Sequence, residues 1–167
     1  EAQQRALSES PDDPASAYNS SVPADNAAVV LVTSRSRAEE LALKPMARVL
    51  GYCRVDCPAP EFLTAPVEAH RRLMEALQQT GKPSEFELIE ANEAFACQLP
   101  YFEEHFGSAQ VNVHGGAVAL GHPLGAAGAR LLTTLLHAMQ THNKSVGLVT
   151  LCFGGGGAVA MAVERLS

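Results

Sequence analysis

Residues 146–163 have the sequence VGLVTLCFGGGGAVAMAV, two apolar runs on either side of four consecutive glycines. Near-continuous apolar runs around a glycine turn are typical of neighbouring strands that are covered on both faces of a sheet. In the second run, Val159, Met161 and Val163 alternate with three alanines. Side chains alternate between the two faces of a strand, so one face of this strand is small enough for a helix to approach closely. The stretch therefore predicts a buried hairpin.

Before this stretch, helical and strand patterns alternate along the chain. Pro123 begins an apolar repeat that predicts a helix to about residue 140. Further back, the patterns predict a strand at 46–55, a helix from a Thr64 cap to Gly81, a strand at 86–91, and a short helix at 92–99 halted by Pro100. Alternating strands and helices predict an α/β fold with a layered, mostly buried mixed sheet.

The front of the chain has a different character. Residues 1–24 are rich in Ser, Pro, Asp, Gln and Ala without an apolar period, which predicts a loop. A β-branched run over residues 27–33 predicts a buried strand, followed by a helix over about 35–42. Of the 18 acidic residues, 17 lie within residues 1–104, so the second half of the chain is predicted to be mostly interior.

The composition argues against several classes of protein. Hydrophobic residues make up 47% of the chain and charged residues 18%, which indicates a packed core rather than disorder. The net charge of −6 disfavours binding to a nucleic acid. No run is long enough for a membrane span and no signal segment opens the chain, so we expect a soluble, cytoplasmic protein. The four cysteines are too few and too irregularly spaced for a disulfide framework and predict reduced thiols.

Three stretches combine a polar or reactive side chain with unusual backbone freedom: NEAFA at 92–96, NVHGGAVALGHPLGAAGAR at 112–130 and CFGGGG at 152–157. His122 precedes the apolar helix, and the positive end of a helix dipole favours a neutral imidazole that can take a proton. A histidine at this position is also explained as a helix cap or as a packed ring. Cys152 and the glycines after it suggest an oxyanion site beside a thiol, or simply a buried cysteine before a turn. Asn92 lies at a predicted junction between a strand and a helix, where the role of N-cap is a plainer explanation than catalysis.

Other motifs find no support in the sequence. It contains no GxGxxG after a strand and no GxxxxGK[ST], which disfavours a dinucleotide or P-loop site. Cys53 and Cys57 lack the second ligand pair that zinc needs. GHPLG is not the GxSxG of a serine hydrolase. We therefore predict neither a metal nor a cofactor.

At the three stretches the sequence resembles the thiolase family, more closely its acetyl-CoA acetyltransferase and 3-ketoacyl-CoA thiolase branch. His122 follows Asn92 by 30 residues, and Cys152 follows His122 by a further 30. The likeness covers roughly residues 17–167. It implies a thiolase-like C-terminal domain over residues 44–167, one βαβαβαββ unit with a buried helix layer, preceded by the tail of the N-terminal half over residues 1–43. Family members build a five-layered core from two similar halves and form dimers or tetramers, so a homo-oligomer is expected.

The resemblance also implies roles for catalytic residues. Cys152 would be the acid and base at Cα of acetyl-CoA, and His122 would activate the family's nucleophilic cysteine. Asn92 would hold a water that forms, with His122, one oxyanion site for the thioester carbonyl. The backbone amide of Gly154 would contribute to the second oxyanion site.

Substrate contacts are implied in the same way. Ala94 and Phe95 would line the pantetheine tunnel, and Ser21 would touch coenzyme A, which is a substrate rather than a cofactor. The implied enzyme transfers acyl groups between CoA thioesters, by Claisen condensation or by thiolytic cleavage of a 3-ketoacyl-CoA. In a eukaryote the resemblance implies mitochondria or peroxisomes.

Some residues depart from the family pattern. The family's nucleophilic cysteine lies in its N-terminal half, and no cysteine of this chain occupies a matching motif, so we expect it to need an N-terminal thiolase half as partner and to be inactive alone. Tyr18, Val22 and Asn26 stand where the family usually has glycine, in a front loop shorter than the family's. These departures keep a second hypothesis open, a non-catalytic thiolase-like subunit or interaction domain. A glycine-rich phosphate-binding module is a third.

Overall fold

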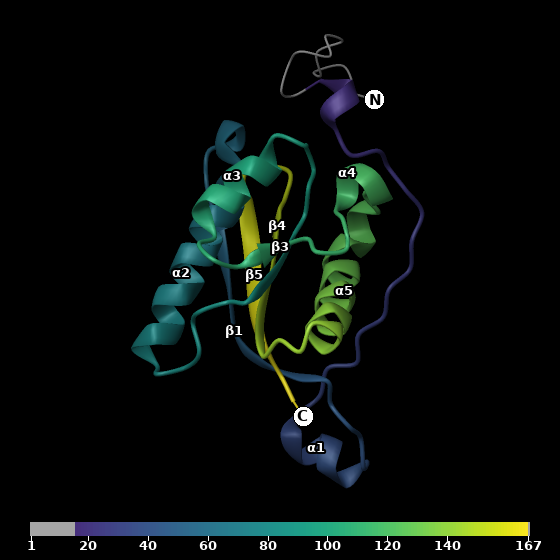
Figure 1. The fold of residues 1–167 in the computed structure, drawn as a ribbon, viewed down its shortest axis with the longest axis vertical. Coiled ribbons are helices and arrows are strands. Elements are labelled where there is room, and N and C mark those ends of the chain that lie inside the picture. The colour runs from purple at the N-terminus through teal and green to yellow at the C-terminus, as the bar shows by residue number, and fades with distance from the viewer. Residues whose placement is uncertain (1–15, 167) are drawn as a thin grey trace.

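The computed structural model describes residues 16–166, and the part of the predicted front loop over residues 1–15 lies outside them. Five strands form one mixed sheet in the order β1-β5-β4-β2-β3 (Figure 1). They are β1 (Ala47–Asp56), β2 (Leu88–Ala91), β3 (Gln110–Val111), β4 (Val146–Cys152) and β5 (Gly157–Arg165). β5 runs antiparallel to both of its neighbours, whereas β2 runs parallel to β4 and β3. The carboxyl ends of β1, β2, β3 and β4 therefore meet at one end of the sheet.

Helices cover both faces of the sheet (Figure 1). One side carries α2 (Ala65–Gln79) and α3 (Gln98–His105), and the other carries α4 (Ala117–Leu120) and α5 (Ala127–Thr141). Short 3₁₀ helices are η2 (Ala17–Asn19), η3 (Ala59–Glu61) and η4 (Leu124–Ala126). From β1 onward the order confirms the α/β fold and the implied βαβαβαββ unit, with α4 as an added short helix. Within residues 16–166, no helix is both long and apolar enough to cross a membrane.

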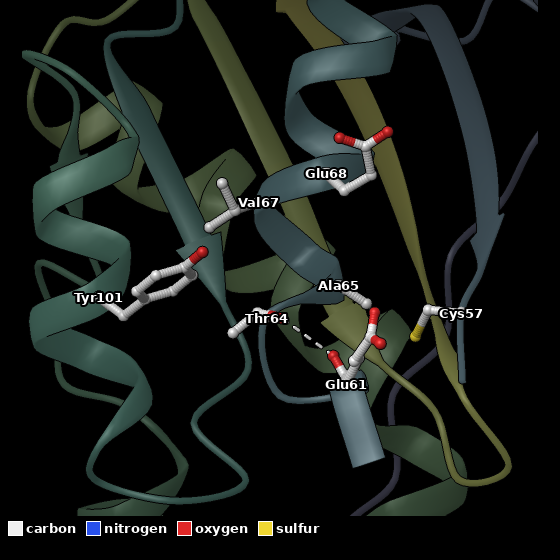
Figure 2. A pocket seen from close by; sticks show the side chains of 7 residues that line it. All are labelled: Cys57, Glu61, Thr64, Ala65, Val67, Glu68 and Tyr101. Atoms are coloured by element: carbon white, nitrogen blue, oxygen red, sulfur yellow. Dashed lines mark hydrogen bonds between the residues drawn. The ribbon is translucent and has the colours of Figure 1, made fainter. Parts of the chain in front are cut away.

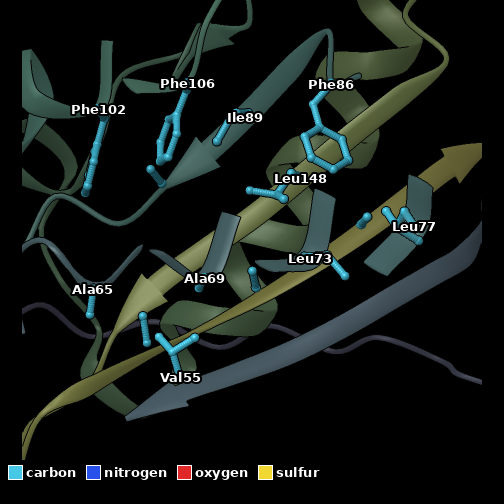
Figure 3. Packing of buried hydrophobic residues seen from close by; sticks show 14 of the residues in the cluster. Val55, Ala65, Ala69, Leu73, Leu77, Phe86, Ile89, Phe102, Phe106 and Leu148 are labelled. Atoms are coloured by element: carbon cyan, nitrogen blue, oxygen red, sulfur yellow. The ribbon is translucent and has the colours of Figure 1, made fainter. Parts of the chain in front are cut away.

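The larger apolar core lies between the sheet and the helices α2 and α3 (Figure 3). Ala69, Leu73 and Leu77 form the buried stripe of α2 and are at most 3% exposed. Opposite them lie the three alanines of β5, which confirms that this face of the strand is small enough for a helix to approach. Burial of each leucine side chain stabilises the fold by about 2 kcal/mol.

A second, smaller core lies between the opposite face of the sheet and α5. Leu131 and Leu135 of α5 pack there with Val149 of β4 and Val163 of β5. Leu148, one residue before Val149, belongs instead to the α2 core. Strand β4 is thus covered on both faces, as its continuous apolar run predicts.

The helix predicted over residues 92–99 is wrong. Residues 92–97 form an irregular loop, and α3 begins only at Gln98, so Pro100 stands in its first turn rather than at its end. Proline is tolerated there because the first amides of a helix have no acceptor within it. Asn92 is therefore no N-cap: its backbone N–H donates to the carbonyl of Thr150 at 3.0 Å and extends the pairing of β2 with β4.

The buried strand predicted over residues 27–33 is also wrong. The segment forms no strand, and Val29, Leu31 and Val32 are 92%, 75% and 75% exposed. Apolar β-branched residues form a stable strand only where a neighbouring strand and a covering layer bury them. Nothing within residues 16–166 supplies either. The helix predicted next is confirmed as α1 (Arg35–Glu40).

The segment before α1 runs beside the sheet domain (Figure 1), from the N-terminal end past α4 and α5 to α1. Isolated β-bridges join Ser20 to Phe95 and Pro23 to His122. The domain boundary predicted between residues 43 and 44 stays a prediction.

Candidate active site

Two predicted site residues lie at the end of the sheet where β2 and β4 finish. Asn92 directly follows β2, and Cys152 is the last residue of the neighbouring parallel strand β4. The pairing of Ala91 with Thr150 holds these strands in register. The carboxyl ends of parallel strands commonly form ligand sites in α/β proteins. The sheet therefore brings the carboxamide and the thiol to the same end of the domain.

The side chain of Asn92 contacts His122, which comes from the loop before α5. Asn92 Nδ2 lies 3.2 Å from His122 Nε2. With the carboxamide nitrogen facing the ring, Nε2 is the acceptor of this hydrogen bond, as in the neutral imidazole with its proton on Nδ1. Burial, and next the positive charge of Arg130, lower the pKa of His122 and favour the same neutral form.

Backbone hydrogen bonds hold the loop that carries His122. The N–H of His122 donates to the carbonyl of Val22 at 2.8 Å, and the N–H of Ala24 donates to the carbonyl of His122 at 3.3 Å. Gly121 has a φ of +89°, and a Cβ there would lie 2.5 Å from the Cβ of Ala24, so the close approach needs glycine. The helix predicted to begin at Pro123 begins only at Ala127, as α5. The short helix η4 therefore separates His122 from the positive end of the α5 dipole.

The predicted substrate residues of the NEAFA loop lie together with Ser21. Both the N–H and the hydroxyl of Ser21 donate to the carbonyl of Ala94 at 3.0 Å. The Phe95 ring packs edge-on against Phe62, with the ring centroids 6.3 Å apart. Contact of Ser21, Ala94 or Phe95 with coenzyme A stays a prediction.

Asn112 and Glu93 fix the site loops, and neither was singled out from the sequence. The Asn112 side chain accepts from the N–H of Ala91 at 2.8 Å and donates to its carbonyl at 2.9 Å and to Glu93 Oε1 at 2.6 Å. The other oxygen of Glu93 accepts from the N–H of Val118 at 3.3 Å. A Cβ on Gly116 would overlap the Glu93 carboxylate. These contacts tie the loop after β3 to the loop after β2.

Cys152 is half-buried, and burial raises the pKa of its thiol. Gln98 Nε2 lies 3.9 Å from its Sγ. Gly154, by contrast, is exposed in the turn between β4 and β5, and in the described part of the chain no hydrogen bond joins it to Asn92, His122 or Cys152. The structure thus joins Asn92 to His122 directly, and the role of the Gly154 amide stays a prediction.

A pocket of about 290 Å³ flanks the His122 loop. It is lined by Gly121 and Pro123 on either side of the histidine, by Arg130, and by the segment that includes Asp25. The pocket places a guanidinium group beside the loop that carries the candidate base.

A second pocket of about 200 Å³ lies at the start of α2 (Figure 2). Its lining includes Cys57, Glu68 and Tyr101, and none of the predicted site residues. Thr64 is the N-cap residue of α2, as predicted, but its hydroxyl donates to the carbonyl of Glu61 at 3.0 Å and accepts from no N–H of the helix. Within residues 16–166, no group of three or more His, Cys, Asp or Glu side chains is placed to hold a metal ion.

Comparison with known proteins adds an independent line of argument. A family model described as "Thiolase, C-terminal domain" matches residues 43–165. The acetyl-CoA acetyltransferase of Escherichia coli strain K12 is 47% identical over 146 residues, which are 86% of this chain and 36% of that protein. The acetyl-CoA acetyltransferase of Allochromatium vinosum is 46% identical over 144 residues, 85% of this chain and 36% of that protein.

Among solved structures, the crystal structure of the Bacillus anthracis acetyl-CoA acetyltransferase matches with a TM-score of 0.73 at 34% sequence identity. The match covers 80% of this chain and 34% of that one. The chain therefore spans about a third of the length of the proteins it resembles.

Proposed function

The chain belongs to the thiolase family, and on that basis we propose that it is the C-terminal catalytic domain of an enzyme that transfers acyl groups between CoA thioesters. The reaction is a Claisen condensation or the thiolytic cleavage of a 3-ketoacyl-CoA. One observation carries the proposal: Asn92 and His122 meet at 3.2 Å at the end of the sheet where β4 finishes at Cys152. Because the relatives are acetyl-CoA acetyltransferases, acetyl is the first acyl group to test.

In this proposal His122 takes the proton of the family's nucleophilic cysteine. A base must be neutral to do so, and burial together with the charge of Arg130 favours the neutral ring. Cys152 exchanges a proton with Cα of the acetyl group. Because burial raises the pKa of this thiol, its thiolate is a stronger base once formed, as a weakly acidic carbon requires.

Asn92 and His122 together stabilise the oxyanion of the thioester carbonyl, His122 as a donor once Nε2 has taken the proton and Asn92 through a bound water. Removal of one such donor typically slows a reaction by about 10² to 10³. Burial raises the pKa of Glu90 to about 7, so this buried acid carries less negative charge near neutral pH than an exposed glutamate would.

The nucleophilic cysteine comes, in this proposal, from an N-terminal thiolase half. The exposed apolar residues Val29, Leu31 and Val32 support such a partner, since they offer an extended segment that a neighbouring sheet could bury. A homo-oligomer and a cytoplasmic location are further predictions of the same proposal.

Replacement of His122 by alanine tests the proposal most directly. The chain is co-expressed with an N-terminal half of the family, and thiolysis of acetoacetyl-CoA is followed. His122→Ala is expected to lower turnover by about 10² to 10⁴, because general acid-base catalysis contributes that much. His137→Ala, on the exposed face of α5, is the matched control. Activity of His122→Ala within about twofold of the parent would reject the role of the histidine.

Cys152→Ser separates the two half-reactions. The acyl-enzyme forms on the partner's cysteine, so its formation is expected to continue, whereas solvent proton exchange at Cα of acetyl-CoA slows because a hydroxyl is a much poorer acid and base at this position. Mass spectrometry of the acyl-enzyme and loss of deuterium from labelled acetyl-CoA measure the two steps. Equal loss in both would count against the assignment.

A non-catalytic subunit is the alternative. Its support is that the Ser21 hydroxyl is engaged by the Ala94 carbonyl, and that Tyr18 and Val22, which replace family glycines, are 73% and 60% exposed in the same segment. Calorimetry with coenzyme A distinguishes the two functions. Binding by the assembled protein favours the enzyme, and its absence favours an interaction domain.

A further inference from the structure

Gln98 is a buried polar residue that none of the sequence motifs singles out. It is the first residue of α3 and is 2% exposed. Its Oε1 accepts from the backbone N–H of Phe95 at 3.1 Å, and its Nε2 donates to the carbonyl of Leu63 at 2.8 Å. The same Nε2 lies 3.9 Å from Cys152 Sγ, within the longer reach of a hydrogen bond to sulfur.

The first two contacts fix which way the carboxamide faces. A backbone N–H can only donate and a backbone carbonyl can only accept, so a rotated amide would set donor against donor at Phe95 and acceptor against acceptor at Leu63. One hydrogen of Nε2 is used by Leu63. The second hydrogen remains, and the nearby sulfur of Cys152 is its acceptor.

The surroundings of Cys152 make this donor important. Burial raises the pKa of the thiol, and the nearby Cys57 thiol, just beyond the end of β1, adds to the effect. The hydrogen bond from Gln98 acts in the opposite direction, as does a backbone amide of Cys152 itself. A buried thiolate without a hydrogen-bond donor would be strongly disfavoured. The side chain of Gln98 provides that donor to Cys152.

We propose that Gln98 is a positioning residue that directs a carboxamide N–H at the Cys152 sulfur, holding that side chain in place and favouring its thiolate. The consequence for acyl transfer rests on the proposed function. The effect on the thiol itself belongs to this chain and is measurable without any turnover.

The test is the pH dependence of alkylation at Cys152. The full chain reacts with iodoacetamide over a range of pH, and mass spectrometry follows the peptide that contains Cys152. In Gln98→Met, which keeps the length of the side chain but lacks the donor, the midpoint is expected to rise by about one pH unit. At neutral pH the reaction slows by only about threefold, because a more basic thiolate is also more nucleophilic. Cys53 on β1 serves as the internal control and keeps its midpoint.

A second measurement covers the case in which Gln98→Met fails to fold. In the unaltered chain, the side-chain amide resonances of Gln98 are followed by NMR against pH. They are expected to titrate at the midpoint of Cys152 alkylation and to lose that transition in Cys152→Ala. A purely structural Gln98 would show neither effect.

The outcomes keep this inference apart from the proposed function. An unchanged alkylation midpoint in folded Gln98→Met, or a Gln98 resonance that ignores the Cys152 titration, overturns the role of Gln98 even if the assembled protein transfers acyl groups. A shifted midpoint supports that role even if no acyl transfer is found.

Discussion

Four side chains near the candidate site carry buried polar atoms with no hydrogen-bond partner within residues 16–166: Glu90, Asn92, His122 and Arg130. Leu88 packs in the α5 core, so Glu90 and Asn92, at alternate positions, face the same side. The charge of Arg130 opposes the burial that raises the pKa of Glu90, and it adds to the burial that lowers the pKa of His122. Each unpaired atom costs about 1–3 kcal/mol, so such a cluster is expected at a functional site rather than in a core.

Glu90 provides a test of this cluster through pH. Burial raises its pKa to about 7, whereas an unfolded glutamate titrates near 4.5. Between these values the folded state binds more protons, so the free energy of unfolding falls as the pH rises through that interval. The glutamine in Glu90→Gln cannot ionise, so the free energy of unfolding of this variant does not fall in this way as the pH rises. We expect it to be more stable than the parent by up to about 3 kcal/mol at pH 8, with the difference shrinking towards pH 5.

Urea denaturation at the two pH values measures this difference. Glu87→Gln is the matched control, because hydrogen bonds from the backbone N–H groups of Ser145 and Val146 lower the pKa of Glu87. Its carboxylate stabilises the fold above its unfolded pKa, and this contribution is lost as the pH falls. Glu87→Gln is therefore expected to be the less stable protein at pH 8. A stability difference for Glu90→Gln that does not change with pH would contradict the prediction.

At the scale of elements, the sequence correctly predicts the helices and strands whose own residues show a clear apolar period or run. The runs expected at 146–151 and 158–163 are β4 and β5, and the helical repeats correspond to α2 and α5. The helix predicted over 92–99 is wrong at 92–97 because the shape of this loop depends on distant partners, such as the Ser21 groups that donate to the carbonyl of Ala94. β3 and α4 are too short to leave any period in the sequence.

The residues of the candidate site likewise include some that the sequence identifies and others that only the structure reveals. His122 and Cys152 could be found because each lies in a stretch with unusual glycines, and Asn92 could be found because NEAFA resembles a motif of the family. Gln98 and Asn112 could not, since the role of an amide depends on which groups face it, and those groups are 54 and 21 residues away. Asn112 adopts a φ of +48°, a conformation that asparagine adopts more readily than most residues, but the sequence around it does not indicate this turn.

The β4–β5 turn gives a prediction for a single element. Gly156 has a φ of +108°, and a Cβ there would overlap the carbonyl of Cys57. Gly156→Ala is therefore expected to destabilise the fold by at least about 2 kcal/mol, from strain and overlap combined. Gly154→Ala, in the same turn but with open space around its Cβ, is expected to stay within about 0.5 kcal/mol of the parent. Urea denaturation compares them, and equal losses would disprove the explanation.

At the scale of the whole molecule, the apolar segment at residues 29–32 is the least protected feature. Three of its side chains are at least 75% exposed, more than a soluble surface normally leaves in one short stretch. We predict that the chain alone self-associates through this segment. Light scattering measures the mass, and a stable monomer would contradict the prediction.

Substitution locates the association. Val29→Lys together with Leu31→Lys is expected to give a smaller particle with an unchanged circular dichroism spectrum, because the segment contributes nothing to either core. Gln79→Lys, at the exposed end of α2, adds charge elsewhere and is expected to leave the association as it was.

The short contacts of residues 21–24 have a practical consequence. The family match begins at residue 43, yet Ser21, Val22 and Ala24 bond to the loops that carry Ala94 and His122. The segment that matches the family model and the segment that holds His122 in place thus start at different points. A shortened chain that begins at residue 43 would keep every motif and both cores, but it would lose the backbone hydrogen bonds from Val22 and Ala24 that hold His122.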